Sequence, residues 1–108
     1  MKNNFEYIKR LKKKGYRLFL LTNITKDSFN YINSVINLDD IFSGGVYSYQ
    51  EHLLKPDYGI YNLILDKYNL NKEETVFFDD KEKNVIAANE IGLKAFKFIS
   101  IADISRNI

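Results

Sequence analysis

Two adjacent aspartates end an apolar run in the stretch TVFFDDKEKNV, from Thr75 to Val85. Two carboxylates held side by side repel each other, so ionising both is costly unless a divalent cation or a basic group lies between them. Magnesium prefers hard oxygen ligands, and it commonly takes one or two protein carboxylates while water and phosphate oxygens complete its shell. Asp79 and Asp80 are therefore predicted to be ligands of Mg²⁺.

Three further polar residues complete a set that suits phosphate chemistry: Thr22, Asn23 and Lys55. A threonine hydroxyl and an asparagine amide can donate hydrogen bonds to phosphate oxygens. A lysine ammonium supplies the positive charge that a transferring phosphoryl group requires. Together with the two aspartates, these residues predict a magnesium-dependent phosphoryl-transfer site.

The elements that must position these residues alternate between helical and strand-like periods. Helical spacing of apolar residues predicts helices over 5–14, 26–36, 55–68, 81–91 and 102–106. Phe5 lies on the apolar stripe of the first of these helices and Tyr61 on that of the third. Short apolar runs predict strands over Tyr16–Leu21, Val46–Tyr49, Thr75–Phe78 and Lys94–Phe98, and 38–45 is predicted to be a loop. No repeat, low-complexity tract or Pro/Gly-rich linker divides the chain, so residues 1–108 are predicted to form one domain.

Alternating helices and strands favour an α/β fold: a three-layer, Rossmann-like parallel sheet with helices on both faces. In such sheets the ligand crevice lies outside the carboxyl ends of the strands. Thr22–Asn23, Ser48–Glu51 and Asp79–Asp80 each follow or end a predicted strand, and Lys55 lies on the loop after the second one. We therefore expect these polar groups to meet at one edge of the sheet.

The composition narrows the class of protein. A hydrophobic fraction of 45% with eight tyrosines and eight phenylalanines predicts a folded domain. The net charge of +2 argues against a nucleic-acid partner, and the basic run Lys9–Lys14 is interpreted as a solvated helix face. The chain has no cysteine and no apolar segment near the roughly 18 residues of a membrane span, which predicts a cytoplasmic protein that does not bind membranes.

Three strings in order resemble the second, third and fourth motifs of the haloacid dehalogenase superfamily of phosphohydrolases: LLTN, KPD and FFDDKEKNVIAANEIGLKAF. The segment Ile41–Asp57 also looks like that family's approach to the lysine, and the likeness extends from about Tyr7 to the end of the chain. Each short motif alone is a weak signal, but three in order, each at a predicted strand end, are a strong one.

The resemblance implies a role for each matching residue. Thr22 would be the hydroxyl that holds the phosphoryl group, with Asn23 beside it, and Lys55 would steady both the phosphate and the nucleophilic carboxylate. Asp79 and Asp80 would be the magnesium ligands, and Asn84 would lie close by in the same turn from loop to helix. The implied activity is Mg²⁺-dependent hydrolysis of a small phosphorylated metabolite.

The sequence departs from the family pattern at its start. Enzymes of this superfamily begin with a strand ending in Asp-x-Asp, which supplies the nucleophile and the acid-base group. Upstream of Thr22 the only acidic residue is Glu6. Neither Asp39–Asp40, which precede a strand, nor Asp57, which is interpreted as a helix-start residue, is placed to substitute. Because the nucleophile is missing, this chain alone is predicted to be inactive. The cap domain of many relatives, which usually selects the substrate, is absent as well, so the sequence does not identify the substrate.

In the family the missing first strand is central, between the strands that end in Thr22 and Asp79. We expect those two strands either to pair directly or to be completed by a neighbouring subunit or a separately encoded N-terminal segment.

Other interpretations remain open from the residues alone. A degenerate, non-catalytic subunit that binds phosphate and Mg²⁺ or serves assembly is the main alternative. Response-regulator receivers use a similar carboxylate, Thr and Lys set, but there the acidic residues precede the others in sequence. Asp79–Asp80 could also serve simply as a helix N-cap, and His52 is interpreted as an exposed loop residue.

Overall fold

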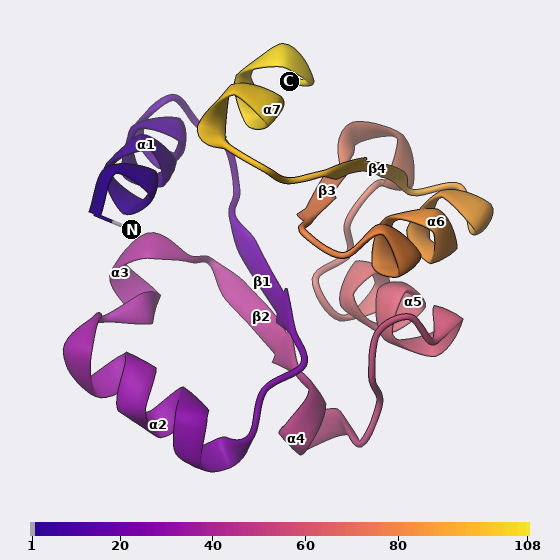
Figure 1. The fold of residues 1–108 in the computed structure, drawn as a ribbon, viewed down its shortest axis with the longest axis horizontal. Helices are drawn as coiled ribbons and strands as arrows, with labels where there is room; N and C mark the ends of the chain where they lie inside the picture. Colours follow the sequence, from indigo (N-terminus) through magenta and orange to yellow (C-terminus); the bar gives the residue numbers. More distant parts are fainter. Residues whose placement is uncertain (1) are drawn as a thin grey trace. The chain divides into compact units, whose positions relative to one another are not determined.

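The chain folds into two compact units, one ending at Leu53 and the other running from Leu54 to Ile108. The computed structural model describes residues 2–108, with side chains from Glu6 onward. Each unit contains one two-stranded parallel sheet (Figure 1), so the predicted α/β class with parallel strands is confirmed. Phe5, which was predicted to lie on an apolar stripe, is outside the residues whose side chains are described.

The first unit builds its sheet from strands β1 and β2. In chain order its elements are α1 (Lys2–Lys13), β1 (Phe19–Thr22), α2 (Lys26–Val35), α3 (Leu38–Ile41), β2 (Gly44–Tyr47) and α4 (Ser48–Glu51). The register runs from Phe19 opposite Gly44 to Thr22 opposite Tyr47. Helix α1 contacts α3, and Leu11, Leu38, Ile41 and Val46 form the buried core of this unit.

Both strands of the first unit differ from their predicted bounds. Strand β1 starts at Phe19 rather than at Tyr16 and includes Thr22, because β2 offers it only four pairing partners. Strand β2 includes Gly45, which was predicted to lie in a loop. A Cβ at Gly45 would lie 2.6 Å from the Tyr47 hydroxyl oxygen, so the missing side chain makes room for that ring. Residues 38–41, also predicted as loop, form the single turn α3.

The second unit builds its sheet from strands β3 and β4. Its elements are α5 (Tyr58–Lys67), the 3₁₀ turn η1 (Lys72–Glu74), β3 (Val76–Asp79), α6 (Glu82–Glu90), β4 (Lys94–Lys97) and α7 (Ile101–Arg106). The register runs from Val76 opposite Lys94 to Asp79 opposite Lys97. Its buried apolar residues are Ile60, Tyr61, Ile64, Leu65, Ala87, Ala88, Leu93 and Ala95. Helices α5 and α6 contact each other, and α6 packs on both strands.

Two helix ends in the second unit follow local sequence signals. Asp57 caps the start of α5, where its carboxylate accepts a hydrogen bond from the Gly59 N–H at 2.8 Å. The helix therefore begins at Tyr58, later than the predicted Lys55. Helix α6 ends just before Gly92, whose φ of 88° is one that a glycine adopts without strain.

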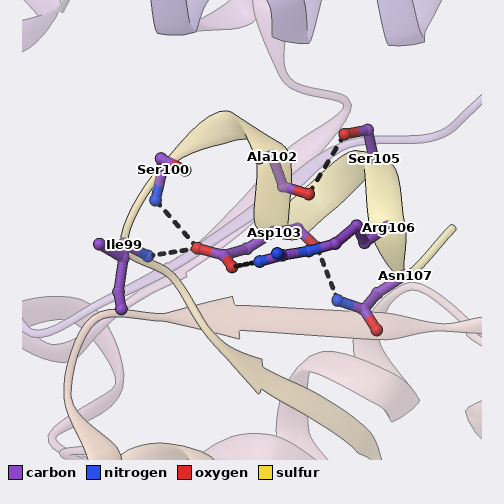
Figure 2. Close-up of polar contacts among 7 residues, drawn as sticks. All are labelled: Ile99, Ser100, Ala102, Asp103, Ser105, Arg106 and Asn107. Atoms are coloured by element: carbon purple, nitrogen blue, oxygen red, sulfur yellow. Dashed lines mark hydrogen bonds and ion pairs between the residues drawn. The ribbon is translucent and has the colours of Figure 1, made fainter.

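The last helix, α7, is capped at its start by the Asp103 carboxylate (Figure 2). Asp103 accepts hydrogen bonds from the N–H groups of Ile99 and Ser100 at 2.8 and 2.9 Å, and Arg106 pairs with the other oxygen of the same carboxylate. This turn follows Phe98 directly, and the Phe98 N–H donates to the backbone carbonyl of Asp79 at 2.8 Å. Phe98 therefore extends the pairing of β3 with β4 by one hydrogen bond, just before the turn.

The strands of residues 2–108 form two separate pairs, β1 with β2 and β3 with β4. Within the same described part of the chain, no helix is both long and apolar enough to cross a membrane.

Candidate functional site

A buried ion pair lies at the carboxyl end of β3. Asp79 is the last residue of the strand, and its Oδ2 atom is 2.6 Å from the Lys55 Nζ atom. The side chains are only 4% and 11% exposed, respectively. A lysine ammonium that is withdrawn this far from water needs a paired carboxylate. Two residues that were predicted to belong to one site, 24 positions apart in sequence, are thus in direct contact.

The Asp79 carboxylate has two more donors. The Lys81 N–H donates to Oδ1 at 2.8 Å, and the Asn84 side-chain amide donates to Oδ2 at 3.1 Å. Burial opposes ionisation of this carboxyl, but the hydrogen bond from Lys55, helped by those from Lys81 and Asn84, outweighs burial and lowers the pKa of Asp79. Asp79 is therefore held as a carboxylate at neutral pH.

Asp80 has a different environment from its neighbour. It is exposed and lies between the end of β3 and Lys81, which is the N-cap residue of α6. The simple N-cap interpretation of the two aspartates therefore does not describe this turn, because Lys81 takes that position and Asp79 accepts from its N–H. Asp80 presents a carboxylate to solvent at the start of a nine-residue helix, where negative charge is favoured.

Asn84 is 1% exposed and contacts Asp79 from the first turns of α6. Its amide must turn the NH₂ group toward the carboxylate, which leaves Oδ1 buried without a hydrogen-bond partner. The Tyr61 hydroxyl donates to the Asn84 backbone carbonyl at 2.9 Å. Burial, with a smaller contribution from the Asp79 charge, raises the pKa of Tyr61 to about 12, so the phenol keeps its proton and remains a donor.

The first unit holds Thr22 and Asn23. Thr22 ends β1 and is half-buried, whereas Asn23 is the exposed residue that follows it. Ser48, buried at the start of α4, bonds to both backbone groups of Ile24: it accepts from the N–H at 2.8 Å and donates to the carbonyl at 3.0 Å. Both site residues therefore lie at the carboxyl end of their strand, as the sequence predicted.

The structure thus groups the predicted site residues by unit. Lys55, Asp79 and Asn84 are in mutual contact or share a partner in the second unit, with Asp80 next in the chain. Thr22 and Asn23 follow one another in the first unit. The meeting of all these groups at one edge stays a prediction. His52 is exposed and adopts a left-handed conformation at the end of α4, in keeping with its interpretation as a loop residue.

Sequence reasoning missed the polar roles of two residues, Tyr61 and Ser48. Tyr61 was assigned only to the apolar stripe of its helix. A tyrosine at the centre of such a stripe is expected to be buried and to need a hydrogen-bond partner for its hydroxyl, and this could have indicated a polar role. For Ser48 the signal was its place directly after a strand, where a short hydroxyl side chain often bonds to backbone.

Comparison with known proteins identifies the family. Residues 1–98 match the sequence profile of the haloacid dehalogenase-like hydrolases. The chain belongs to this family.

Two curated relatives are similar over most of the chain. The sesquiterpene phosphatase astK of Aspergillus oryzae is 34% identical over 86 residues, which cover 80% of this chain and 44% of astK. Bifunctional epoxide hydrolase 2 of Mus musculus is 32% identical over 87 residues, or 77% of this chain and 16% of the relative. The chain therefore spans less than half the length of these two relatives.

Solved structures of the family share the fold. A predicted HAD-like family hydrolase from Porphyromonas gingivalis superposes with a TM-score of 0.86 at 28% identity, over 98% of this chain and 56% of that one. A HAD family enzyme from Bacteroides thetaiotaomicron superposes with a TM-score of 0.88 at 22% identity, over 98% and 55% of the two chains. The same enzyme was also solved in complex with magnesium and inorganic phosphate, a structure that covers 90% of this chain with a TM-score of 0.84. These likenesses confirm the Rossmann-like α/β fold.

Asp79 and Asp80, at the end of β3, carry the type of ligand atom that Mg²⁺ prefers, but they are only two residues. Carboxylate oxygens are the hard ligands that Mg²⁺ prefers, and one or two of them are enough when water and phosphate oxygens complete the shell. In the described part of the chain no group of three or more His, Cys, Asp or Glu residues could hold a metal. This chain therefore offers the carboxylates of Asp79 and Asp80 and no further cluster in that part.

Proposed function

We propose that this chain carries the phosphate-binding and magnesium-binding portion of a haloacid dehalogenase-like phosphohydrolase that acts on a small phosphorylated metabolite. The observation that carries the proposal is the buried Lys55–Asp79 pair at the end of β3, directly followed by the exposed carboxylate of Asp80. Family membership supports it, as do a relative named as a phosphatase and a similar structure solved with magnesium and phosphate.

The two aspartates have different roles in this proposal. Three donors already occupy Asp79, which suits it to orient the Lys55 ammonium more than to face a cation. Asp80 is exposed, and its carboxylate is the one that would be presented to Mg²⁺. A bound magnesium ion would supply positive charge against the phosphate oxygens.

Three side chains would bind the phosphate in this proposal: those of Lys55, Thr22 and Asn23. The Lys55 ammonium keeps its position because Asp79 holds it, and it would balance the charge that accumulates on the phosphoryl oxygens. Thr22 and Asn23 would donate hydrogen bonds to the same group, as the order of the family motifs implies. Each of these groups binds or orients, and none of them is a nucleophile.

The nucleophile of the family, the first aspartate of an Asp-x-Asp strand, is not in this sequence. We propose that the chain by itself turns over no phosphate ester, and that an N-terminal segment or a second copy of the chain completes the site. A monomer at high concentration in light scattering would exclude completion by a second copy.

The first test is ligand binding, which does not depend on turnover. Amide resonances of Asp79 to Asn84 would be followed by NMR during titration with MgCl₂ and then with inorganic phosphate. Asp80→Asn should remove the magnesium-dependent shifts. The matched control is Asp39→Asn, because Asp39 is likewise an exposed aspartate with a second aspartate beside it in the chain. Equal magnesium shifts in wild type and Asp80→Asn would overturn the assignment of Asp80.

A second candidate function is a binding or assembly subunit without catalysis. The observation that favours it is the sequence itself, which has the phosphate and metal residues but no Asp-x-Asp motif. Magnesium or phosphate binding that depends on Asp80, with no turnover after any complementation, would support this candidate over the first.

A further inference from the structure

We propose that Ser48 is a positioning residue that sets the backbone of the turn after β1 and thereby the orientation of Thr22 and Asn23 toward phosphate. The inference rests on the proposed function for its consequence, but its structural basis lies entirely within the first unit. It is carried by the two hydrogen bonds between the Ser48 hydroxyl and the backbone of Ile24.

The Ser48 hydroxyl makes the next hydrogen bonds after the last backbone pair of β1 and β2. The backbone ladder between β1 and β2 ends with Thr22 opposite Tyr47. Ser48 is the next residue after Tyr47 and begins α4, so its backbone turns away into a helix. Its side chain nevertheless serves both the N–H and the carbonyl of Ile24, at 2.8 and 3.0 Å, as a neighbouring strand would.

A hydroxyl is well suited to this position. It can accept one hydrogen bond and donate another at the same time, which neither an ammonium nor a carboxylate can do. Ser48 is only 9% exposed, and both of its bonds to Ile24 are partly buried. Without the hydroxyl, two backbone groups of Ile24 would lose their partner in a place where water replaces it poorly.

The consequence for the site follows from how short the turn is. Thr22 is fixed by the sheet, Ile24 by Ser48, and Thr25 by its role as N-cap of α2, where it accepts from the Ser28 N–H at 3.1 Å. Only Asn23 lies between the first two fixed points. The Ser48 contact therefore helps to fix the backbone from which the Asn23 side chain projects, directly after Thr22.

The test compares Ser48→Ala with Ser48→Thr, which keeps a hydroxyl. Ser48→Cys, which keeps the volume but bonds weakly, replaces the alanine variant if that variant does not fold. The control is Ser34→Ala, which removes an exposed hydroxyl that also bonds to a backbone carbonyl, that of Tyr31 at 2.6 Å. Two quantities would be measured by NMR on the full chain: amide hydrogen exchange at Ile24, and the dissociation constant of inorganic phosphate from the Thr22 and Asn23 amide shifts.

Loss of two backbone hydrogen bonds is expected to speed Ile24 exchange about tenfold in Ser48→Ala and to weaken phosphate binding by a similar factor. In Ser48→Thr, the exchange rate of Ile24 and the dissociation constant of phosphate should both stay close to the wild-type values. Ser34→Ala should change neither quantity. Unchanged Ile24 exchange in the folded alanine or cysteine variant would overturn the inference. So would faster exchange with unchanged phosphate affinity, since the contact would then be structural only.

Failure of the proposed function looks different in this experiment. If wild-type protein shows no phosphate-dependent shifts at Thr22 and Asn23, the phosphate assignment of these residues is wrong and the functional part of the inference falls with it. The exchange rate of Ile24 still decides whether Ser48 holds the turn.

Discussion

The ion pair between Lys55 and Asp79 holds the lysine ammonium in one position. A flexible lysine on a surface samples many rotamers, whereas Lys55 is held at 2.6 Å from a carboxylate that two further donors also orient. Such a pair adds little net stability compared with apolar residues, but breaking it leaves a buried charge without a partner. In the proposed phosphate site the pair would serve to hold the Lys55 ammonium in position, and its removal should be visible in stability as well as in binding.

Asp79→Asn should lower the free energy of unfolding at pH 7 by about 3 kcal/mol, because Lys55 loses its counter-charge in a poorly solvated place. The measurement is urea unfolding, with Asp66→Asn on the exposed face of α5 as the control. In a double-mutant cycle with Lys55→Met, the two losses should not add, since either substitution already breaks the pair. Additive losses would mean that the two residues are not coupled.

Asn84→Asp should destabilise the protein more than Asn84→Ala at pH 7. The new carboxylate would lie beside Asp79 in a position that is 1% exposed, and both burial and the neighbouring charge favour its protonated form. The difference between the two variants should therefore shrink as the pH is lowered from 7 to 5, which thermal unfolding would measure. A constant difference over that range would contradict the predicted contact with Asp79.

At the scale of elements, several strands and helices end where a side chain hydrogen-bonds to backbone groups. Ser48 continues the β1–β2 ladder, Asp103 caps α7, and the Lys72 ammonium donates to the Ile91 carbonyl at 2.7 Å, at the end of α6. Each sheet has only two strands, so the ladder itself supplies few hydrogen bonds. These contacts therefore decide where the elements end.

Lys72→Met should lower the free energy of unfolding by about 1 kcal/mol, because it removes a charged donor from the C-terminal carbonyls of α6 while keeping an apolar stem. That stem lies near Gly92, where the Lys72 Cδ atom would be 3.4 Å from an added Cβ. Chemical unfolding measures the loss, and Lys83→Met on the exposed face of α6 is the control. An equal loss in both variants would argue against the cap.

The α7 cap should make stability depend on pH in the acid range. The N–H groups of Ser100 and Ile99, with help from Arg106, lower the pKa of Asp103 below its ordinary 3.8. A carboxyl whose pKa is lower in the folded state stabilises the protein above its ordinary pKa, and this contribution is lost as the pH falls through the folded value.

Asp103→Asn should therefore lower the melting temperature at pH 7 and flatten its decline from about pH 5 to pH 3. Melting curves across this range would measure both changes, and Arg106→Gln, which leaves the two backbone donors in place, should have the smaller effect. A pH profile of Asp103→Asn parallel to that of wild type would contradict the role of this carboxyl.

At the scale of the whole molecule, the sequence contains the LLTN, KPD and FFDD strings but no Asp-x-Asp. It covers 44% of astK and 16% of epoxide hydrolase 2, so the comparison is between this chain and a part of each relative. Strands β1 and β3 belong to separate two-stranded sheets. The complementing strand that we propose would provide both a carboxylate nucleophile and further backbone pairing.

Adding a segment that forms a strand ending in Asp-x-Asp should produce Mg²⁺-dependent hydrolysis of a phosphate ester, while the chain alone should produce none. The measurement is release of inorganic phosphate with and without Mg²⁺. The control is the same segment with Asn in place of its first aspartate, since this change removes the nucleophile and keeps the strand. Hydrolysis by the chain alone that Asp79→Asn abolishes would contradict the predicted inactivity.

The α/β class and most helices could be predicted from the sequence, because apolar periods depend on residues that are only a few positions apart. The family could be predicted from three short motifs in order. The LLTN, KPD and FFDD strings also placed Thr22 and Asp79 at the ends of their strands, and the structure agrees. Asp57 was recognised as a helix-start residue for the same reason: an N-cap serves an N–H two residues ahead.

Only the tertiary structure decided which side chains hold one another. The bonds of Lys55 to Asp79, Tyr61 to Asn84 and Ser48 to Ile24 join residues 23 or 24 positions apart. Strand ends were decided in the same way, since β1 extends only as far as β2 offers partners. Such contacts depend on how elements pack, and no local period of the sequence encodes that packing.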